Sequence, residues 1–456
     1  MGITSALNAA RSGLQAASLG IETTSNNVAN ASTEGYSRRA VRTKGGLAVT
    51  MGGNARGTGV AIDRVARATD WFVTKRVVET AGDVGEAQTR RDALALAESW
   101  FSEGEVSGIS SRLQSFYDTL TTATTDPGNM SARRAVLTEA DRFAEGVTRI
   151  ASSLVDIQTE LEDRSADLAS SVNKRLEEVA GLNSRILEAG DPDAASDLID
   201  RRDQVARTLA EDLGAELRID RETGEASVLL SGMALVQEGE FMTVEAGEND
   251  DGELTLFVGK GDLDLGDEAG GRIGGMMAAW EKVEGYLTDL DSLVADLGDA
   301  LNTAHQSGYD LSGTAGDELF TWDTSIEHAS TSFALNTDVT AEKLAFAGDS
   351  NGSVGDVTNL KVMLDVEGEE LFGSQTAEQF MNSLVSEVGT DVNEAEADLL
   401  HYGAVMSDMD ALRDSVAGVD LDEEAADLIK YQTAYQAAAK VMSVADELIA
   451  TLLQVV

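Results

Sequence analysis

Apolar side chains recur every seven residues at the C-terminal end of the chain, in a run that contains no Gly or Pro. Between Leu421 and Val456 they alternate at spacings of three and four, which is the pattern of a helix with one narrow apolar stripe. Such a stripe must lie against another apolar surface, so this helix needs a partner. The residues that we expect to mediate its contacts are Leu428, Tyr431, Tyr435, Met442, Ile449 and Leu452.

A matching stripe lies at the opposite end of the chain. Ile3, Ala10, Ala17 and Thr24 repeat every seven residues, and four residues after each of them comes another member of the stripe. The N-terminal assembly row that we expect consists of Ile3, Leu7, Leu14, Ile21 and Val28. Two such stripes suit a terminal coiled coil of residues 1–35 and 421–456, with the rest of the chain inserted between them. An amphipathic surface helix of an ordinary domain has the same periodicity, so the pattern alone leaves that alternative open.

Between the two ends, the pattern predicts a long helical bundle. Helical spacing extends over residues 65–100, 106–123, 130–188, 194–213, 273–305 and 376–416. One nearly continuous stripe runs from Val147 to Ile186, which is longer than a compact globule needs. We therefore expect an elongated bundle domain made of residues 36–213, 272–306 and 372–420.

In the middle of the chain, the apolar residues recur with a period of two, which is typical of strands. Strands are predicted at residues 216–220, 227–230, 234–237 and 254–258, separated by Gly-rich turns. Residues 40–65 alternate weakly and predict a short hairpin or an extended arm. We assign residues 214–271 together with 307–371 to one β-rich inserted outer domain. The predicted fold is therefore mainly α, with paired terminal helices, an elongated helical bundle and a small β domain inserted in it.

The charge of the chain limits its partners. The formal net charge is −47, which disfavours binding to nucleic acid or to an anionic membrane surface. No run of 18 apolar residues exists, and the N-terminus has no secretory signal pattern. The basic residues of the first 70 positions outnumber the acidic ones by eight to four, so a basic patch there could bind a neighbouring copy. These basic residues are Arg11, Arg38, Arg39, Arg42, Lys44, Arg56, Arg64 and Arg67.

The sequence offers little for catalysis or metal binding. It has no Cys and only three His, at positions 305, 328 and 401, which do not fall at metal-ligand spacing. No nucleophile elbow or His-Glu-x-x-His motif is present. We expect no enzyme activity, no metal and no cofactor. His305 is expected to contact the turn that follows its helix.

The segment after the first helix carries a recognisable motif. Ser25-Asn-Asn-Val-Ala-Asn30 is followed by a turn at Gly35-Tyr36-Ser-Arg38. This segment resembles the N-terminal signature of flagellar rod, hook and hook-associated proteins. Glu34 replaces the Pro that is usual in that turn, and Gly35 still permits a positive φ. The residues that match the family motif are Asn26, Asn27, Asn30, Gly35 and Tyr36.

Further segments resemble the same family, so the similarity extends over most of the chain. Asn302-x-x-His305-x-x-Gly-x-Asp-x-x-Gly313 is the most specific match, and it is similar to the hook-associated members. Tyr431 to Lys440 resembles the C-terminal signature of these proteins. Ser131 to Leu137 and Asp197 to Asp203 are further matches, and we interpret the charges of the latter as ion pairs on a helix surface.

The resemblance implies a function. It implies a secreted structural subunit of the bacterial flagellum that forms a ring between hook and filament through its terminal helices. The implied partners are other copies of the chain, the hook protein, a second hook–filament junction protein, and an export chaperone on the C-terminal helix. The alternative within the family is another axial protein: hook, rod or second junction protein. Outside it, an adhesin or protease in the β-rich insertion and a cytosolic coiled-coil signalling protein are the competing classes.

Overall fold

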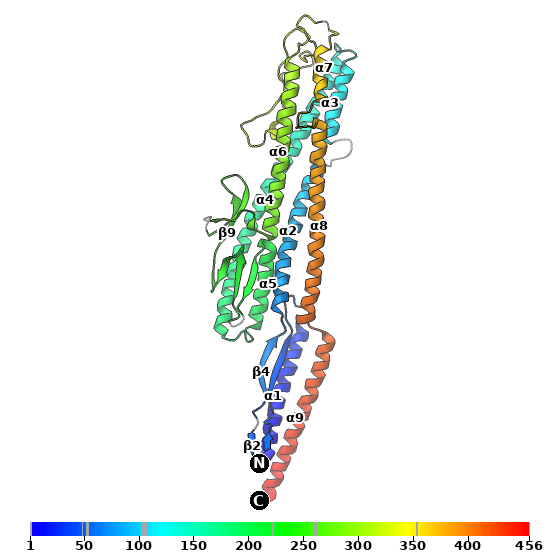
Figure 1. The fold of residues 1–456 in the computed structure, drawn as a ribbon. Coiled ribbons are helices and arrows are strands. Elements are labelled where there is room, and N and C mark those ends of the chain that lie inside the picture. The colour runs from blue at the N-terminus through cyan, green and yellow to red at the C-terminus, as the bar shows by residue number, and fades with distance from the viewer. Residues whose placement is uncertain are drawn as a thin grey trace.

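The computed structural model describes residues 2–47, 49–51, 54–101, 108–220, 223–259, 263–352 and 354–455. They form an elongated molecule (Figure 1). We call residues 2–67 and 419–455 the stalk, which contains both chain ends. A helical bundle continues from the stalk, and a small β-rich lobe lies against the side of the bundle. The prediction of a mainly α fold with paired terminal helices and inserted β structure is confirmed.

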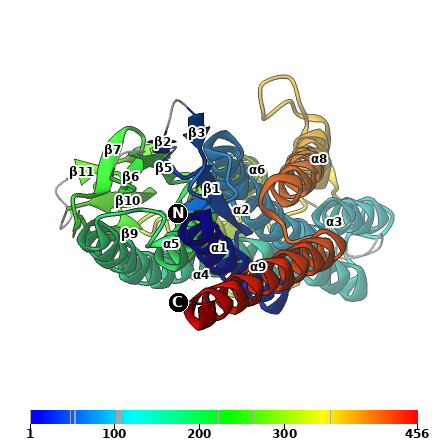
Figure 2. The ribbon, with the colours of Figure 1, turned by 90° about the horizontal axis from the view of Figure 1, so that it is seen from below.

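The stalk is built on two long helices. α1 (Gly2–Ala29) and α9 (Leu421–Val455) lie side by side in opposite directions (Figures 1 and 2). A hairpin of β1 (Arg39–Gly45) and β4 (Val60–Arg67) packs on α1, and β2 (Val49–Met51) pairs with β3 (Asn54–Arg56) at its tip. The domain division expected from the sequence placed this hairpin in the bundle. The structure differs, because the Val60 N–H donates to Ser12 Oγ of α1 at 3.2 Å and so ties the hairpin to the stalk.

Apart from α7 (Thr358–Asp365), which the sequence did not predict, the helices of the bundle follow the predicted ones closely. The bundle consists of α2 (Trp71–Phe101), α3 (Ile109–Ala123), α4 (Met130–Ala189), α5 (Ser196–Leu213), α6 (Gly271–Gln306), α7 and α8 (Ala377–Ala417). α4 has 60 residues and is about 90 Å long. The Asn129 side chain accepts from the N–H groups of its first turn, and Gly190 ends it at a φ of 68°. Leu154 and Leu176 of α4 and Leu290 of α6 are fully buried, as an elongated core requires.

Two small antiparallel sheets form the β-rich lobe. One has the order β5 (Glu216–Ile219), β6 (Ala226–Leu230), β7 (Met233–Gln237) and β8 (Glu240–Phe241); the other has β11 (Leu263–Asp264), β10 (Leu254–Val258) and β9 (Val244–Glu248). Val228 and Leu256 belong to the continuous core that the lobe shares with α4. The sequence predicted β5, β6, β7 and β10. It missed β8 and β11, which have two residues each, and β9, whose Val-Glu-Ala-Gly-Glu shows no alternation.

Residues 307–371 do not lie beside residues 214–271, with which the sequence analysis grouped them in one outer domain. They pack on α4, α6 and α3 at the end of the bundle farthest from the stalk, while residues 214–271 lie beside its middle (Figure 1). β12 (Phe320–Thr321) and β13 (Ala334–Leu335) are their only paired strands among the described residues. The single outer domain is therefore two separate regions. Hydrogen bonds from the end of α6 explain the placement of the second one.

The Asn302–Gly313 motif makes those hydrogen bonds. Asn302 Oδ1 accepts from the Leu319 and Phe320 N–H groups at 2.7 and 2.8 Å, and its Nδ2 donates to the Phe320 carbonyl. His305 Nδ1 lies 2.6 Å from the Asp317 carbonyl, and its Nε2 accepts from the Ala345 N–H at 3.0 Å. Burial lowers the pKa of His305, which suits this neutral tautomer. The expected contact of His305 with the following turn is confirmed, and the motif is a structural clamp.

His328 forms a second clamp, and its charge makes a pH-dependent contribution to stability. Its ring lies 3.1 Å from Asp291 Oδ2 and 3.4 Å from Glu284 Oε2, both on α6. Asp291 and then Glu284 raise the pKa of His328 to about 10. A raised folded-state pKa stabilises the fold fully below the unfolded value of about 6.5, and this stabilisation is lost as pH rises through about 10.

We therefore expect His328→Gln to lower the free energy of unfolding by about 2 kcal/mol near pH 7. The difference from the unaltered chain should shrink towards about pH 11, because the histidine loses its charge there. Urea unfolding followed by circular dichroism at both pH values measures this difference. The control is His401→Gln, since His401 is exposed on α8 and should change little. A His328 effect that does not vary with pH would contradict the assigned charge.

Candidate assembly site: the stalk and its joint

The two stalk helices meet in a fixed antiparallel register. Contacts recur every seven residues on each helix, and the residue numbers rise on α1 as they fall on α9. Three pairs fix the register: Gly13 with Ala438, Gly20 with Tyr431, and Asn27 with Glu424. A seven-residue repeat on both helices is the geometry of a coiled coil.

Small and polar side chains, rather than the predicted large ones, fill this contact on α1. Ala10, Ala17, Gly20, Thr24 and Asn27 are buried. The predicted N-terminal row lies to one side of the contact line, because each member follows a contact residue by about 100° around the helix. Leu7, Leu14 and Ile21 are half-buried, Val28 is 43% exposed, and the side chain of Ile3 lies outside the described residues.

The C-terminal row occupies the contact line and one flank of it. Leu428, Tyr431, Met442 and Ile449 are half-buried, Tyr435 is 39% exposed, and the side chain of Leu452 lies outside the described residues. Since the helices are antiparallel, helix geometry puts the N-terminal row and this flank on the same side of the pair. We call this surface the shared ridge: Leu7, Leu14, Ile21, Leu428, Tyr435 and Met442. Small residues let the helices approach closely and leave the large side chains at the ridge.

The close approach makes a prediction for two glycines of α1. A Cβ at Gly20 would lie 2.5 Å from the Tyr431 ring, whereas a Cβ at Gly13 would lie 3.9 Å from Ala438 Cβ. We expect Gly20→Ala to separate the helices and lower the stability of the pair by about 1–3 kcal/mol. Gly13→Ala should be neutral or stabilising by about 0.5–1 kcal/mol, because Ala favours the helix. Amide hydrogen exchange of α9 in the two variants measures the effect, and equal protection would refute the assigned register.

The family turn motif closes the top of α1 around one side chain. Asn27 Oδ1 accepts from Tyr36 Oη at 2.8 Å and from the Arg39 N–H at 3.0 Å, and its Nδ2 donates to Glu424 Oε2 at 3.0 Å. Asn30 Nδ2 donates to the Asn26 carbonyl at 2.9 Å, and Asn26 Oδ1 accepts a second, longer bond from Tyr36 Oη. Gly35 has a φ of 78°, so the turn uses Gly as expected although Glu34 precedes it. Asn27 thus connects α1, the hairpin and α9.

Two arginines, Arg39 and Arg67, brace the stalk against the bundle, and Arg38 beside Arg39 points the opposite way, to α9 within the stalk. Arg38 Nε lies 2.6 Å from Glu424 Oε1 of α9, whose side chain is only 2% exposed. Burial alone would lower the pKa of Arg38, but its hydrogen bond with Glu424 leaves the pKa above its usual value. Arg39 instead pairs with Asp197 and Asp200 of α5. Successive side chains of an extended strand point to opposite sides, so one segment reaches both α9 and α5.

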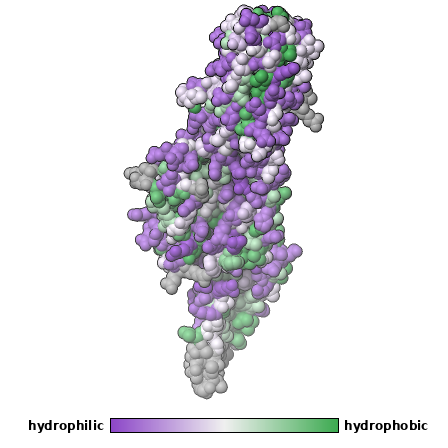
Figure 3. All heavy atoms as spheres, turned by 45° about the horizontal axis from the view of Figure 1, so that its top comes forward, coloured by the Kyte–Doolittle hydropathy of each residue, from purple (hydrophilic) through white to green (hydrophobic). Residues whose placement is uncertain are grey.

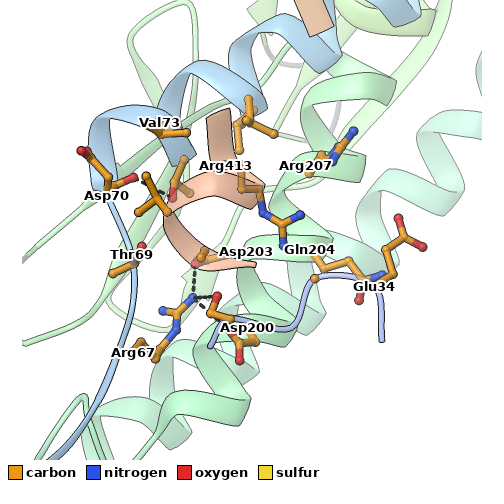
Figure 4. A pocket seen from close by; sticks show the side chains of 17 residues that line it. Glu34, Arg67, Thr69, Asp70, Val73, Asp200, Asp203, Gln204, Arg207 and Arg413 are labelled. Atoms are coloured by element: carbon orange, nitrogen blue, oxygen red, sulfur yellow. Dashed lines mark hydrogen bonds and ion pairs between the residues drawn. The ribbon is translucent and has the colours of Figure 1, made fainter. Parts of the chain in front are cut away.

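Arg67 completes this joint from the other strand of the hairpin. Its position pairs with Arg39 across the β1–β4 ladder. Arg67 Nη2 lies 2.7 Å from Asp200 Oδ1 and 3.1 Å from Asp203 Oδ2, and Figure 4 shows it pointing from β4 towards both carboxylates. Asp200 therefore forms ion pairs with two arginines, Arg39 and Arg67. The charges of residues 197–203 act as ion pairs, as the sequence indicated. The three acidic residues bind the hairpin, while Arg202 pairs with Asp203 and Arg201 pairs with Glu178 of α4.

Five basic residues of the predicted patch form ion pairs within the chain. Arg38, Arg39 and Arg67 pair as described, and Arg64 and Lys44 pair with Asp193 and Asp63. The acidic partners of these five residues therefore lie within the same molecule: on α9 and α5 for the first three, just before α5 for Arg64, and on β4 for Lys44. Binding of a neighbouring copy through the patch stays a prediction.

A pocket beside the joint is lined by side chains of α2, α5 and α8, including Val73, Gln204 and Arg413, together with the ion-paired groups (Figure 4). Among the residues that the structure describes, no three His, Asp or Glu side chains are grouped so as to hold a metal ion. Within the same residues, no helix is long and apolar enough to cross a membrane. The arrangement fixes the direction of the stalk relative to the bundle.

The sequence missed the joint and the contact line. Arg38 and Arg39 stand next to each other without any periodic pattern, and their partners are more than 150 residues away. A signal for the contact line did exist, since Ala10, Ala17 and Thr24 repeat every seven residues. The sequence analysis instead assigned the contact with α9 to the larger apolar residues of α1.

Three family models match the chain. The model described as "Flagellar hook-associated protein FlgK helical domain" matches residues 94–320. The model "Flagella basal body rod protein" matches residues 7–36, and "Flagellar basal body rod FlgEFG protein C-terminal" matches residues 414–455. The two terminal matches coincide with the stalk helices, and the central match covers most of the bundle and the β-rich lobe.

Similar proteins cover nearly the whole chain. It is 26% identical over 490 residues to flagellar hook-associated protein 1 of Bacillus subtilis, covering 97% of this chain and 96% of the relative. It is 22% identical over 553 residues to the protein of the same name from Salmonella typhimurium, covering 99% and 100%. The solved structure of the flagellar hook junction protein FlgK from Burkholderia pseudomallei has a TM-score of 0.67 at 13% identity, covering 76% of this chain and 100% of that chain. Because the sequence identity is only 13%, this last match is evidence for the fold alone.

Proposed function

Because the chain belongs to the family of flagellar hook-associated protein 1, we propose that it is a structural subunit of the junction between hook and filament. Copies form a ring in which the stalks pack side by side towards the axis and the bundles form the next shell. The other flagellar partners are the hook protein on one side and a second junction protein on the other. The chain acts without enzyme activity and reaches its place by secretion.

One observation supports this proposal most strongly: α1 has almost no charge. Only Arg11 and Glu22 are charged among its 28 residues, in a chain in which 25% of residues are charged. A helix that faced water on all sides would not need such a composition. Together with the half-buried side chains of the shared ridge, it fits a helix that neighbouring copies cover after assembly.

Deletion of the gene tests this function. Cells that lack the chain should retain hooks, carry no filaments and release flagellin monomers into the medium. Electron microscopy and immunoblotting of the medium measure both effects. Cells without hooks would instead favour a rod or hook subunit, the alternative within the family. Normal filaments would exclude the junction function.

The C-terminal helix also fits a chaperone before export. α9 exposes Val441, Val444 and Leu448, which would favour aggregation in the cytoplasm. An amphipathic helix in the groove of a partner is one way to cover such side chains. We expect an export chaperone to bind a chain that starts at Thr69 and not a chain that ends at Gly418. Co-purification measures this, and binding that survives the C-terminal truncation would move the site elsewhere.

A further inference from the structure

The stalk has a second apolar surface, on the opposite side of α9 from the shared ridge. Val441, Val444 and Leu448 are 47%, 42% and 50% exposed, and they form a groove with Ala437, Ala445 and Ala6. Within the part of the chain that the structure describes, Lys440 is the one charged residue that lines it. We call Ala437, Val441, Val444 and Leu448 the outer face of α9. Figure 3 shows apolar residues gathered on the stalk beside the grey end of the molecule.

Helix geometry separates the two surfaces. Glu424, Tyr431, Ala438 and Ala445 form the row that faces α1. The ridge residues of α9 lie about 60° to one side of this row, and the outer face lies about 60–100° to the other. On α1, the hairpin covers the side of the outer face, as the Val60 bond to Ser12 requires. The stalk therefore presents two different apolar surfaces that point away from each other.

The distribution of charge indicates what covers them. Residues 1–67 and 419–456 carry 10 basic and 10 acidic residues, whereas the remaining 351 residues carry 24 basic and 71 acidic ones. Stalks of neighbouring copies can therefore approach without net repulsion, while the bundles repel each other. An acidic bundle is a poor partner for an apolar face, and a second stalk is a good one.

We propose that the outer face of α9 in one copy packs against the shared ridge of the next copy. This inference rests on the proposed function and specifies its contact. Two different complementary surfaces make a heterologous contact, in which every copy uses both surfaces and the series can close into a ring. A contact of one surface with itself would instead stop at a dimer.

Disulfide cross-linking tests this pairing cleanly, because the chain has no Cys. Val444→Cys is combined with Leu7→Cys, Leu14→Cys or Ile21→Cys in three double variants, since the offset between neighbouring stalks decides which ridge residue comes close. Flagella are purified from cells in which the variant is the only copy, oxidised, and run on a denaturing gel without reductant. At least one double variant should give a ladder of multimers, and the four single variants should remain monomers.

The possible outcomes distinguish a failure of the inferred contact from a failure of the proposed ring. Dimers from Val444→Cys alone would indicate a self-contact and overturn the inference. Junctions seen by electron microscopy without cross-links in any of the three double variants would overturn the inference and leave the proposed function intact. If the unaltered chain forms no ring at hook ends, the proposed function and the inference both fail. Circular dichroism and motility of the reduced variants show whether each one folds and assembles.

Discussion

Cells whose only copy carries Leu14→Asp or Leu428→Asp are expected to export the subunit, shed flagellin and lose motility. Both side chains are half-buried on the shared ridge, so a carboxylate there can remain solvated in the free molecule. In the ring, the neighbouring stalk would bury it without a partner, at a cost of several kcal/mol for every copy. Immunoblots of the medium and swimming assays measure the effect, which should be close to complete loss.

Leu96→Asp is the matched control for this prediction. Leu96 is 44% exposed on α2, in the bundle, about 37 Å along the helix from its first residue Trp71, which follows the stalk hairpin. The same change of Leu to Asp there should leave filaments and motility nearly normal. If the two stalk variants swim as well as this control, the stalk does not form the inner contact of the junction.

Asp200→Ala is expected to loosen the joint between stalk and bundle. The side chain of Asp200 is 11% exposed and receives both Arg39 and Arg67. Removal of the shared acceptor leaves two poorly solvated guanidinium groups and costs about 3 kcal/mol. The core of the bundle is separate from this site, so unfolding of the bundle should change little. The direction of the stalk should instead become variable.

Spin-label distances measure this variability. Labels on Ser443→Cys in α9 and Glu177→Cys in α4 are exposed and unique in a chain without native Cys. Asp200→Ala should broaden the distribution of distances between them and weaken filament attachment. Asp63→Ala is the control, because the Lys44–Asp63 pair lies on the exposed part of the same hairpin and should have no effect. An unchanged distribution in Asp200→Ala would mean that the ion pairs do not hold the joint.

The sequence predicted the elements better than it predicted their contacts. The period of 3.6 located each long helix within a few residues, because one-sided burial along a helix leaves that trace in the sequence. The strand Leu254–Val258 was predicted for a related reason, since four of its five residues are buried. The division into domains was less accurate, because hydrogen bonds such as those of Asn302 place residues 307–371, and they leave no periodic pattern.

The assembly residues show the same limit. Helical spacing identified the two rows at the termini, and both lie on the stalk. It could not show that Gly20 and Asn27 occupy the contact while Leu14 stays at the edge, because the closeness of two helices depends on side-chain size on both. The outer face of α9 was also missed. Val441, Val444 and Leu448 follow helical spacing, but they have no covering partner within the chain from which their role could be inferred.

Electron microscopy of isolated hooks incubated with the purified chain tests the central claim most directly. The claim is that the stalks form the inner contact of a ring at the hook end. The account predicts a ring at the distal end of each hook, with the stalks directed towards the axis and the bundles outside them. Binding along the sides of the hook, or a ring whose stalks point outwards, would contradict it.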